Sequence, residues 1–466
     1  MVLGPTSFYN DLGDCQHVCQ YCCATFWYEE RSKQHYKDGR IHYNKCCNVG
    51  KVSLPMPPNP PEYIKGLFRD PHFMDNIRAY NSMFSMTSFG ASVDETINSG
   101  SGPYVFRLCG QIYHWIGTMC PPPGDAPKFL QLYICDTRNE VRNRISHFGG
   151  ENSTPLKQEI VTGLIKFLDE HNHLVKLFRT ARDKCIADDI PEFHIRLFNK
   201  PKNRQYELPV TDGLGAIVFE TGPKSQNDYD VIIHSKEGFP QRINKLHPAY
   251  MSMQFPLLFI YGESGYQQEL KLVNPTTTTP INSRRLTIRM FYSFQLHDHF
   301  NRYSLILMGG RLFQQYIVNA WLSIEQCRLD YIQQKQSDIR SEYLQGIHNA
   351  LLRGDHDGSD LGSRIILPSS FVGGPRYMYK HYQDALAICR VHGNPQFFVT
   401  FTCNIKWPEI KRYMLQFPLL KAQDRPDIVS RIFDMKVKEL VKFLKDHKPL
   451  GDIVAGMCYH TYSIRY

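Results

Sequence analysis

The chain has 466 residues, of which 42% are hydrophobic and 13% aromatic, and a formal net charge of +9. This composition excludes a largely disordered chain, and the length predicts two or three domains with a sizeable core. No window is apolar over roughly 18 residues, and no apolar run follows the N-terminus, so the sequence predicts neither a membrane span nor a secretory signal.

Six of the fourteen cysteines lie within the first 47 residues. Cys19 and Cys22 form a Cys-x2-Cys pair, and Cys46 and Cys47 follow after 23 intervening residues. Because zinc binds four thiolates or imidazoles in a tetrahedron, these four cysteines predict a structural zinc site. Adjacent side chains tend to diverge, so His17 and Cys15 remain alternative ligands. The competing interpretation is a set of reduced surface thiols.

The remaining cysteines are scattered singly, several of them in apolar stretches, as is typical of buried thiols in a reducing compartment. Residues 1–60, which end in the proline-rich run PMPPNPPE, are therefore interpreted as a Cys-rich zinc module followed by an extended connector.

The middle region, 65–290, mixes both kinds of secondary structure. Leu156–Ala181 has the apolar period of a helix with a break near His171. Leu246–Gly265 is predicted to be a buried, turn-rich segment, and Pro275–Pro280 an exposed loop. Strands are predicted over Tyr104–His114, Phe129–Cys135, Ala216–Phe219 and Val231–His234.

The last region, 291–466, is predicted to be mainly helical and to lead into a small α/β domain. Apolar residues from Phe313 to Tyr331 keep a 3.6-residue period, and a second helix begins at Pro375 and ends at Gly393. Predicted next are a strand over Phe397–Thr402, a helix over Phe433–Leu444 and a strand over Ile453–Thr461. The predicted fold class is α+β, in several domains.

Two His-x-His pairs have the spacing of a metal-binding pair on a strand. His171-Asn172-His173 and His297-Asp298-His299 each have a polar residue between the histidines, so both are interpreted as solvated surface. The phosphate-binding pattern Gly-x4-Gly-Lys-Ser/Thr does not occur in the sequence, and no ATP site is predicted.

Several blocks, in the same order, resemble proteins of the Helitron family, the rolling-circle DNA transposons of eukaryotes. They include ATFWYEER (24–31), NIRAYNSMFSMTSFGASVD (76–94), LPSSFVGGPRYM (367–378) and FFVTFTCNIKWPEI (397–410). Cys23 stands where the resemblance suggests a glycine-like position, which leaves the zinc ligand set open.

The resemblance implies a nuclease domain with a central antiparallel sheet. The nuclease-core positions that it assigns to this chain are Phe401, Thr402, Asn404, Trp407 and Glu409. In the family a later His-hydrophobic-His pair holds a divalent metal and a Tyr-x3-Tyr pair attacks the phosphate, and this chain ends at Tyr466 before that pattern. The expectation is a truncated, nuclear, DNA-binding protein with no catalytic residues, no catalytic divalent metal and no helicase activity.

Two other functions stay open. One is an active metal-dependent single-strand nuclease that uses His460, and the other is a non-catalytic scaffold for protein partners.

Positive side chains indicate where DNA, in particular single-stranded DNA, would bind. Arg284, Arg285 and Arg289 form one cluster, and Lys406 stands beside the ring of Trp407. Lys200, Lys202 and Arg204 form a further basic loop. The alternative for each is an ordinary solvated charge, and Trp407 fits a core position as well as a base-stacking one. The strand Ile453–Thr461 is expected to expose an edge that pairs with a partner strand.

Overall fold

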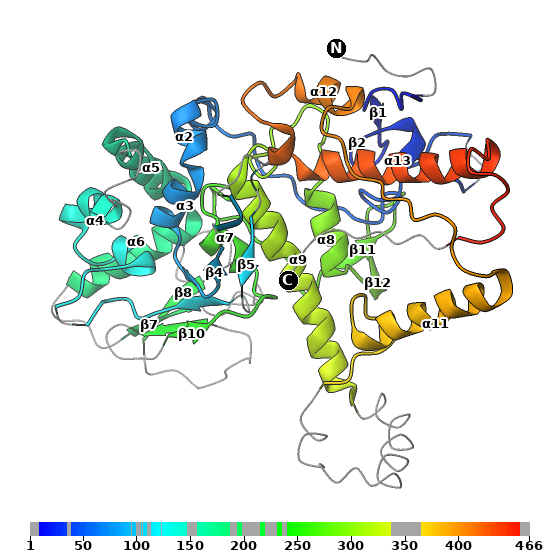
Figure 1. The fold of residues 1–466 in the computed structure, drawn as a ribbon. Helices are drawn as coiled ribbons and strands as arrows, with labels where there is room; N and C mark the ends of the chain where they lie inside the picture. Colours follow the sequence, from blue (N-terminus) through cyan, green and yellow to red (C-terminus); the bar gives the residue numbers. More distant parts are fainter. Residues whose placement is uncertain are drawn as a thin grey trace, which may run out of the picture. The chain divides into compact units, whose positions relative to one another are not determined.

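The computed structural model combines helices with small antiparallel sheets, which confirms the mixed helix-and-strand class (Figure 1). It describes residues 9–34, 39–94, 96–98, 104, 106–109, 113–122, 124–146, 156–186, 193–197, 215–219, 231–234, 240–336 and 365–456. The chain forms two compact units. Unit 1 comprises Met1–Asn319 with Ile405–Ile432, and unit 2 comprises Ala320–Asn404 with Phe433–Tyr466. The boundaries predicted near residues 60 and 290 stay predictions.

The strands are short, and all their pairings are antiparallel. The sheets, in the order of neighbouring strands, are β1-β2, β10-β6-β3, β11-β12, β4-β5 and β8-β7-β9. The strand bounds are β1 His17–Val18, β2 Thr25–Phe26, β3 Ser88–Phe89, β4 Ser92–Val93, β5 Leu108–Cys109, β6 His114–Ile116, β7 Phe193–Leu197, β8 Gly215–Phe219, β9 Val231–His234, β10 Gln241–Arg242, β11 Lys271–Val273 and β12 Pro280–Arg285.

Helices supply most of the regular structure. Their bounds are α1 Glu62–Leu67, α2 Pro71–Asp75, α3 Ile77–Phe84, α4 Glu140–Ser146, α5 Gln158–His171, α6 His173–Ile186, α7 Tyr250–Gln254, α8 Ile288–Gln295, α9 Arg311–Gln334, α11 Pro375–His392, α12 Pro408–Met414 and α13 Pro426–Asp446. Single turns of 3₁₀ helix are η1 Tyr28–Glu30, η2 Thr96–Asn98, η3 Phe129–Tyr133, η4 Thr137–Asn139 and η5 Ala422–Asp424.

The predicted break near His171 lies at Asn172, between α5 and α6. Asn172 has an extended backbone (φ −88°, ψ 121°), and its Oδ1 accepts hydrogen bonds from the backbone N–H groups of Leu174 and Val175. This is the geometry of a helix cap, so the same residue ends one helix and starts the next. Its Nδ2 donates to the carbonyl oxygens of Phe259 and Ile260, which fixes the break against the buried segment.

The segment 246–265 is buried as predicted. Asn81 Nδ2 donates to the carbonyl oxygen of Gln254, and the His114 ring stacks on Tyr250 with the ring centroids 3.9 Å apart. Burial lowers the pKa of His114 to about 3, so this histidine is neutral in the core.

Of the other predictions for unit 1, some are confirmed and one is wrong. Strands β8 and β9 confirm two predicted strands, and the 274–279 loop joins β11 to β12 as expected. Of Tyr104–His114, the described parts hold only β5 and the start of β6. The strand predicted over Phe129–Cys135 is wrong, because Leu130, Leu132 and Tyr133 are all buried on successive sides of the 3₁₀ helix η3. When consecutive residues are all buried, the sequence lacks the alternation of apolar and polar residues that distinguishes a strand from a helix.

In unit 2, the predicted helices are confirmed and the predicted strands are wrong where the structure describes them. Helix α11 starts at Pro375, and the N–H of Gly393 (φ 82°) bonds to the carbonyl oxygen of Cys389. Residues 397–402 and 453–456 have no regular structure, and 457–461 lie outside the described residues. A β-strand forms only where a neighbouring strand can hydrogen-bond to its backbone N–H and C=O groups. No strand pairing involves the described part of unit 2, and Phe398 is 96% exposed.

Candidate metal centre

The first pair of cysteines lies on a tight hairpin. Strands β1 and β2 flank it, the N–H of Cys19 donates to the carbonyl oxygen of Ala24 (2.8 Å), and the N–H of Cys23 donates to that of Cys19 (2.9 Å). Cys23 has φ 60°, the left-handed conformation that favours glycine, and its side chain is exposed. Its glycine-like position is thus a backbone requirement, and its thiol is not among the clustered ones.

The second pair lies on another turn. Asn48, Val49 and Gly50 all have positive φ, and the N–H of Val52 closes the turn on the carbonyl oxygen of Cys47 (2.9 Å). The N–H of Gly50 points at the Cys47 sulfur, 3.2 Å away. At Gly50 (φ 79°) a Cβ atom would stand 2.5 Å from the Tyr21 ring, so only glycine fits between the two turns.

These two turns bring Cys19, Cys22, Cys46 and Cys47 together, with all four sulfurs within 4.8 Å of one another. The Sγ atoms of Cys19 and Cys47 are 3.6 Å apart, and those of Cys46 and Cys47 are 3.7 Å apart. Sulfurs about 2.3 Å from a tetrahedral zinc ion stand about 3.8 Å apart. The predicted clustering of the four cysteines is confirmed, and the cluster is compatible with a structural metal.

The alternative ligands do not join the cluster. His17 packs between Phe26 and Tyr28, with ring centroids 5.6 Å and 5.5 Å away. Cys15 lies apart from the four sulfurs, and burial raises the pKa of its thiol to about 11. Among the residues that the structure describes, the four predicted cysteines are the one group of three or more metal-capable side chains found close together.

The four thiols affect one another's protonation. Hydrogen bonds from Cys22, Cys46 and Cys47 lower the pKa of Cys19, whereas the pKa of Cys46 is raised because its thiol lies against the other three sulfurs. The pKa of Cys47 is lowered as well, because the contact with Cys19, which raises it, is outweighed by hydrogen bonds from Cys22 and Cys46. The cluster therefore favours thiolates, the form in which cysteine binds metals.

The segment 297–300 is hydrogen-bonded to the backbone of the first hairpin. Nδ1 of His299 lies 2.8 Å from the carbonyl oxygen of Cys22 and donates to it, since that oxygen can only accept. The N–H of Thr25 donates to the carbonyl oxygen of Asp298 (2.8 Å), and the N–H of Phe300 to that of Cys23 (2.8 Å). The hairpin thus has a second layer of support, as metal-binding turns commonly do.

The interpretation of His297 and His299 as solvated surface is wrong. Their residues are 8% and 7% exposed, because the histidines lie under the Cys-rich hairpin rather than on an open loop. Nε2 of His297 is 2.8 Å from the Tyr43 hydroxyl, and burial lowers the pKa of His297 to about 4. In the other pair, Asn172 is buried as the helix cap, and His171 stacks on Phe167.

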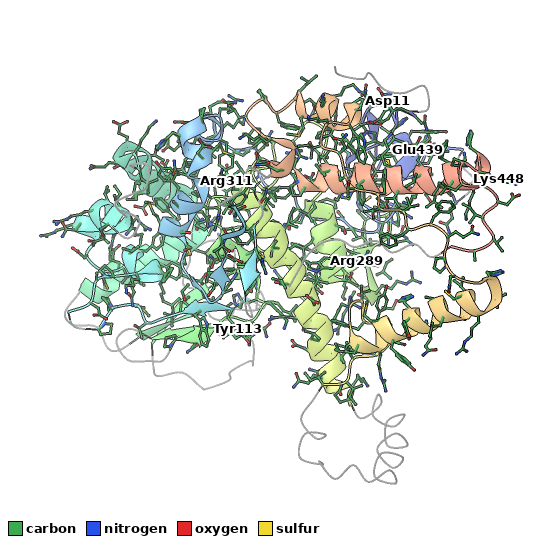
Figure 2. The ribbon with its side chains drawn as sticks, viewed as in Figure 1. Asp11, Tyr113, Arg289, Arg311, Glu439 and Lys448 are labelled. Atoms are coloured by element: carbon green, nitrogen blue, oxygen red, sulfur yellow. The ribbon has the colours of Figure 1, made fainter. Side chains whose placement is uncertain are left out.

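Helix α12 is joined to the N-terminal segment. Arg412 makes ion pairs with Asp11 (2.6 Å) and Asp14 (2.6 Å), as the place of Asp11 beside this helix in Figure 2 illustrates. Glu409 accepts hydrogen bonds from the Tyr9 hydroxyl and, at 2.9 Å, from the N–H of Leu12. Two sequence blocks about 400 residues apart therefore meet in unit 1.

The five nuclease-core positions fall on both sides of the boundary between the units. In unit 2, Phe401 is half-buried against Phe433, with ring centroids 5.7 Å apart, and Thr402 and Asn404 are exposed. In unit 1, Trp407 is half-buried at the start of α12, and Glu409 is buried and holds the N-terminal segment.

The predicted DNA-contacting side chains that the structure describes are exposed. Arg284 and Arg285 end strand β12, Arg289 lies in the first turn of α8 (Figure 2), and Lys406 precedes α12. The basic loop with Lys200, Lys202 and Arg204 lies outside the described residues. None of the helices in the described part of the chain is long and apolar enough to cross a membrane.

A comparison with protein families agrees with the sequence blocks. Residues 291–462 match the family described as the Helitron helicase-like domain at the N-terminus. This match confirms the resemblance to Helitron-type proteins that the blocks predict, over a little more than a third of the chain. No curated protein matched the chain.

Proposed function

We propose that this chain is a DNA-binding part of a Helitron-type transposition protein, with a structural zinc ion in its Cys-rich segment. The observation that carries the proposal is the match of residues 291–462 to the Helitron helicase-like domain. A role on transposon DNA in eukaryotic cells also implies a nuclear location.

The zinc part of the proposal is supported by the four sulfurs. Cys19, Cys22, Cys46 and Cys47 offer a closed, all-thiolate ligand set, which suits structural zinc rather than the oxygen-preferring magnesium ion. The ion would join two turns that already meet where Gly50 lies against the Tyr21 ring. We expect one zinc ion per chain by elemental analysis of the purified protein, and a content near zero would refute this part.

The DNA part is supported by exposed arginines on a chain with net charge +9. Removing one arginine that pairs with a phosphate lowers the salt dependence of single-strand binding by about 0.7 in log–log slope. Replacing Arg284, Arg285 and Arg289 together by glutamine should therefore lower the slope by about 2 and weaken binding at low salt.

Fluorescence anisotropy with a labelled single-stranded oligonucleotide, over a range of salt concentrations, measures both quantities. Arg142→Gln, an exposed arginine of helix α4, is the matched control and should leave the slope unchanged. Absence of DNA binding, or binding insensitive to salt, would favour the protein scaffold instead. A duplex of the same sequence tests the preference for single strands.

We also propose that the chain binds DNA without cutting it. The thiolate cluster itself is not a candidate for the cutting centre, because its four ligands would enclose the metal and leave no open position for a phosphodiester. Incubation of a labelled single strand with the protein and magnesium or manganese is the test. Metal-dependent nicking that disappears on His460→Ala would establish the nuclease function instead.

A further inference from the structure

A cavity of about 350 Å³ lies within unit 1, away from the cysteine cluster. Its wall is formed by the end of α1, by the segment 298–308 and by residues 416–425 around η5. Cavities that hold small ligands begin at about 300 Å³. The size therefore suits one small molecule or one unit of a polymer.

The wall carries more positive than negative charge. Arg69, Arg302 and Arg425 line it, against a single carboxylate, that of Asp298. The Asp298 Oδ2 atom already accepts a hydrogen bond from the Tyr413 hydroxyl (2.9 Å), so part of its charge is satisfied within the protein. The two arginines that no buried carboxylate neutralises, Arg69 and Arg302, favour an anion.

The three arginines differ in how strongly they are held. Arg302 is exposed and makes no ion pair with any residue that the structure describes, and Arg69 is 3.5 Å from the exposed Glu62. Arg425 is fully buried and pairs with Asp427 (2.8 Å), while its Nη1 bonds to no group in the described part of the chain. Arg302 and Arg69 can therefore turn toward a ligand, whereas the charge of Arg425 is balanced by Asp427 and only its unbonded Nη1 remains to donate.

The rest of the wall is aromatic and apolar. Phe68, Tyr303 and Phe417 line the cavity, and the Tyr303 hydroxyl is buried with no hydrogen-bond partner among the described residues. A bare phosphate would make no use of this apolar wall. Aromatic rings beside arginines are the combination on which nucleotide bases stack while their phosphates are paired.

From these features we infer that the cavity binds a nucleoside phosphate, either free or as the phosphorylated end of a DNA strand. The inference deepens the proposed DNA binding and rests on it for the second source. The base packs against the aromatic wall, and Arg302 and Arg69 pair with the phosphate.

Isothermal titration with thymidine monophosphate, thymidine and inorganic phosphate tests the chemistry. The monophosphate should bind at least about tenfold more tightly than either of its parts. Arg302→Gln should weaken it about tenfold, and Arg142→Gln should not change it. Inorganic phosphate binding as tightly as the monophosphate, or no binding of the monophosphate at all, overturns the inference.

A second variant guards against misfolding. Leu419 lines the cavity and is 42% exposed, so Leu419→Gln and Leu419→Glu should both fold. Only the glutamate should weaken monophosphate binding, because it adds a negative charge to the wall. Equal effects of the two substitutions count against a phosphate in this cavity.

Oligothymidylate with and without a 5′-phosphate separates the two sources. If only the phosphorylated strand displaces the monophosphate, the ligand is a strand end, and if neither does, it is the free nucleotide. If the protein binds the oligonucleotide but not the monophosphate, the inference about the cavity is wrong and the proposed DNA-binding function stands. If the protein binds the monophosphate but no oligonucleotide, the inference about the cavity stands and the proposed DNA-binding function is wrong.

Discussion

The ion pair between Arg431 and Glu30 offers the sharpest test of how the Cys-rich segment is held. Arg431 Nη2 and Nε lie 2.6 Å and 2.9 Å from the two carboxylate oxygens, and Nη2 also donates to the carbonyl oxygen of Thr25 (3.0 Å). The two side chains are 12% and 1% exposed. Arg431→Met keeps much of the volume and removes the charge.

The expected loss in the free energy of unfolding is about 3–5 kcal/mol, because the substitution leaves a buried carboxylate without its partner. The N–H of Trp27 still donates to Glu30 at 3.0 Å, which favours the lower end of that range. The double variant Glu30→Gln/Arg431→Met should lose less free energy of unfolding than Arg431→Met alone, since no unpaired buried charge remains.

The pH dependence gives an independent check. Burial raises the pKa of Glu30, but the hydrogen bond and the charge of Arg431 outweigh it, and the pKa is lowered overall. The pair therefore stabilises the folded protein above the unfolded pKa of about 4.3, and this contribution is lost as the pH falls through the folded pKa. In Arg431→Met the largest lowering causes are gone and burial is opposed mainly by the hydrogen bond from the N–H of Trp27, so the pKa of Glu30 rises. The difference in the free energy of unfolding between Arg431→Met and wild type should then become smaller as the pH is lowered from 7 to 5.

Urea unfolding followed by tryptophan fluorescence at both pH values measures these differences. Arg412→Met is the matched control: its ion pairs with Asp11 and Asp14 are more exposed (37% for the arginine side chain), and it should lose only about 1 kcal/mol or less. Equal losses for the two variants, or a difference from wild type that does not depend on pH, would refute the reasoning.

Three further predictions concern the thiols and the turn beside them. Cys47→Ser should remove stoichiometric zinc, measured by elemental analysis, and lower the melting temperature. Zinc retention should also fall at acidic pH as the thiolates are protonated. Gly50→Ala should destabilise the protein more than Gly13→Ala in thermal melts. Both glycines have positive φ, but only at Gly50 would the added methyl group meet an aromatic ring at 2.5 Å. Cys120 and Cys135, with sulfurs 2.8 Å apart, should form a disulfide with oxidised glutathione. Mass spectrometry after alkylation would then show both protected, and equal alkylation before and after oxidation would contradict this.

Local patterns allowed the helices and the metal cluster to be predicted. The 3.6-residue period of α9, the proline and glycine at the ends of α11, and the Cys-x2-Cys spacing each express a constraint among residues close in sequence. The spacing could not decide between Cys15, His17 and the Cys46–Cys47 pair, because that choice depends on the turn at Gly50. That turn has three consecutive residues with positive φ, and in the sequence only its Asn and Gly are residue types that indicate such a conformation.

Interactions between distant segments were missed. His299 supports the carbonyl group of Cys22 from 277 residues away, and the sequence shows only a His-x-His pattern with a polar centre. Glu409 has the place of a nuclease-core residue by resemblance, yet in the structure its carboxylate binds the backbone of Leu12. Such roles depend on tertiary pairing, which has no periodic signature.

The joining of the first thirty residues to α12 and the start of α13 has a consequence for biosynthesis. A ribosome adding about 5–20 residues per second needs on the order of 20–80 s to make the roughly 400 residues between the two partners. During that time the surfaces of Trp27 and Glu30 that later meet Arg431 are exposed to solvent. Nascent chains halted before α12 should therefore recruit chaperones through this segment, and release of that chaperone should coincide with the emergence of residues 405–432.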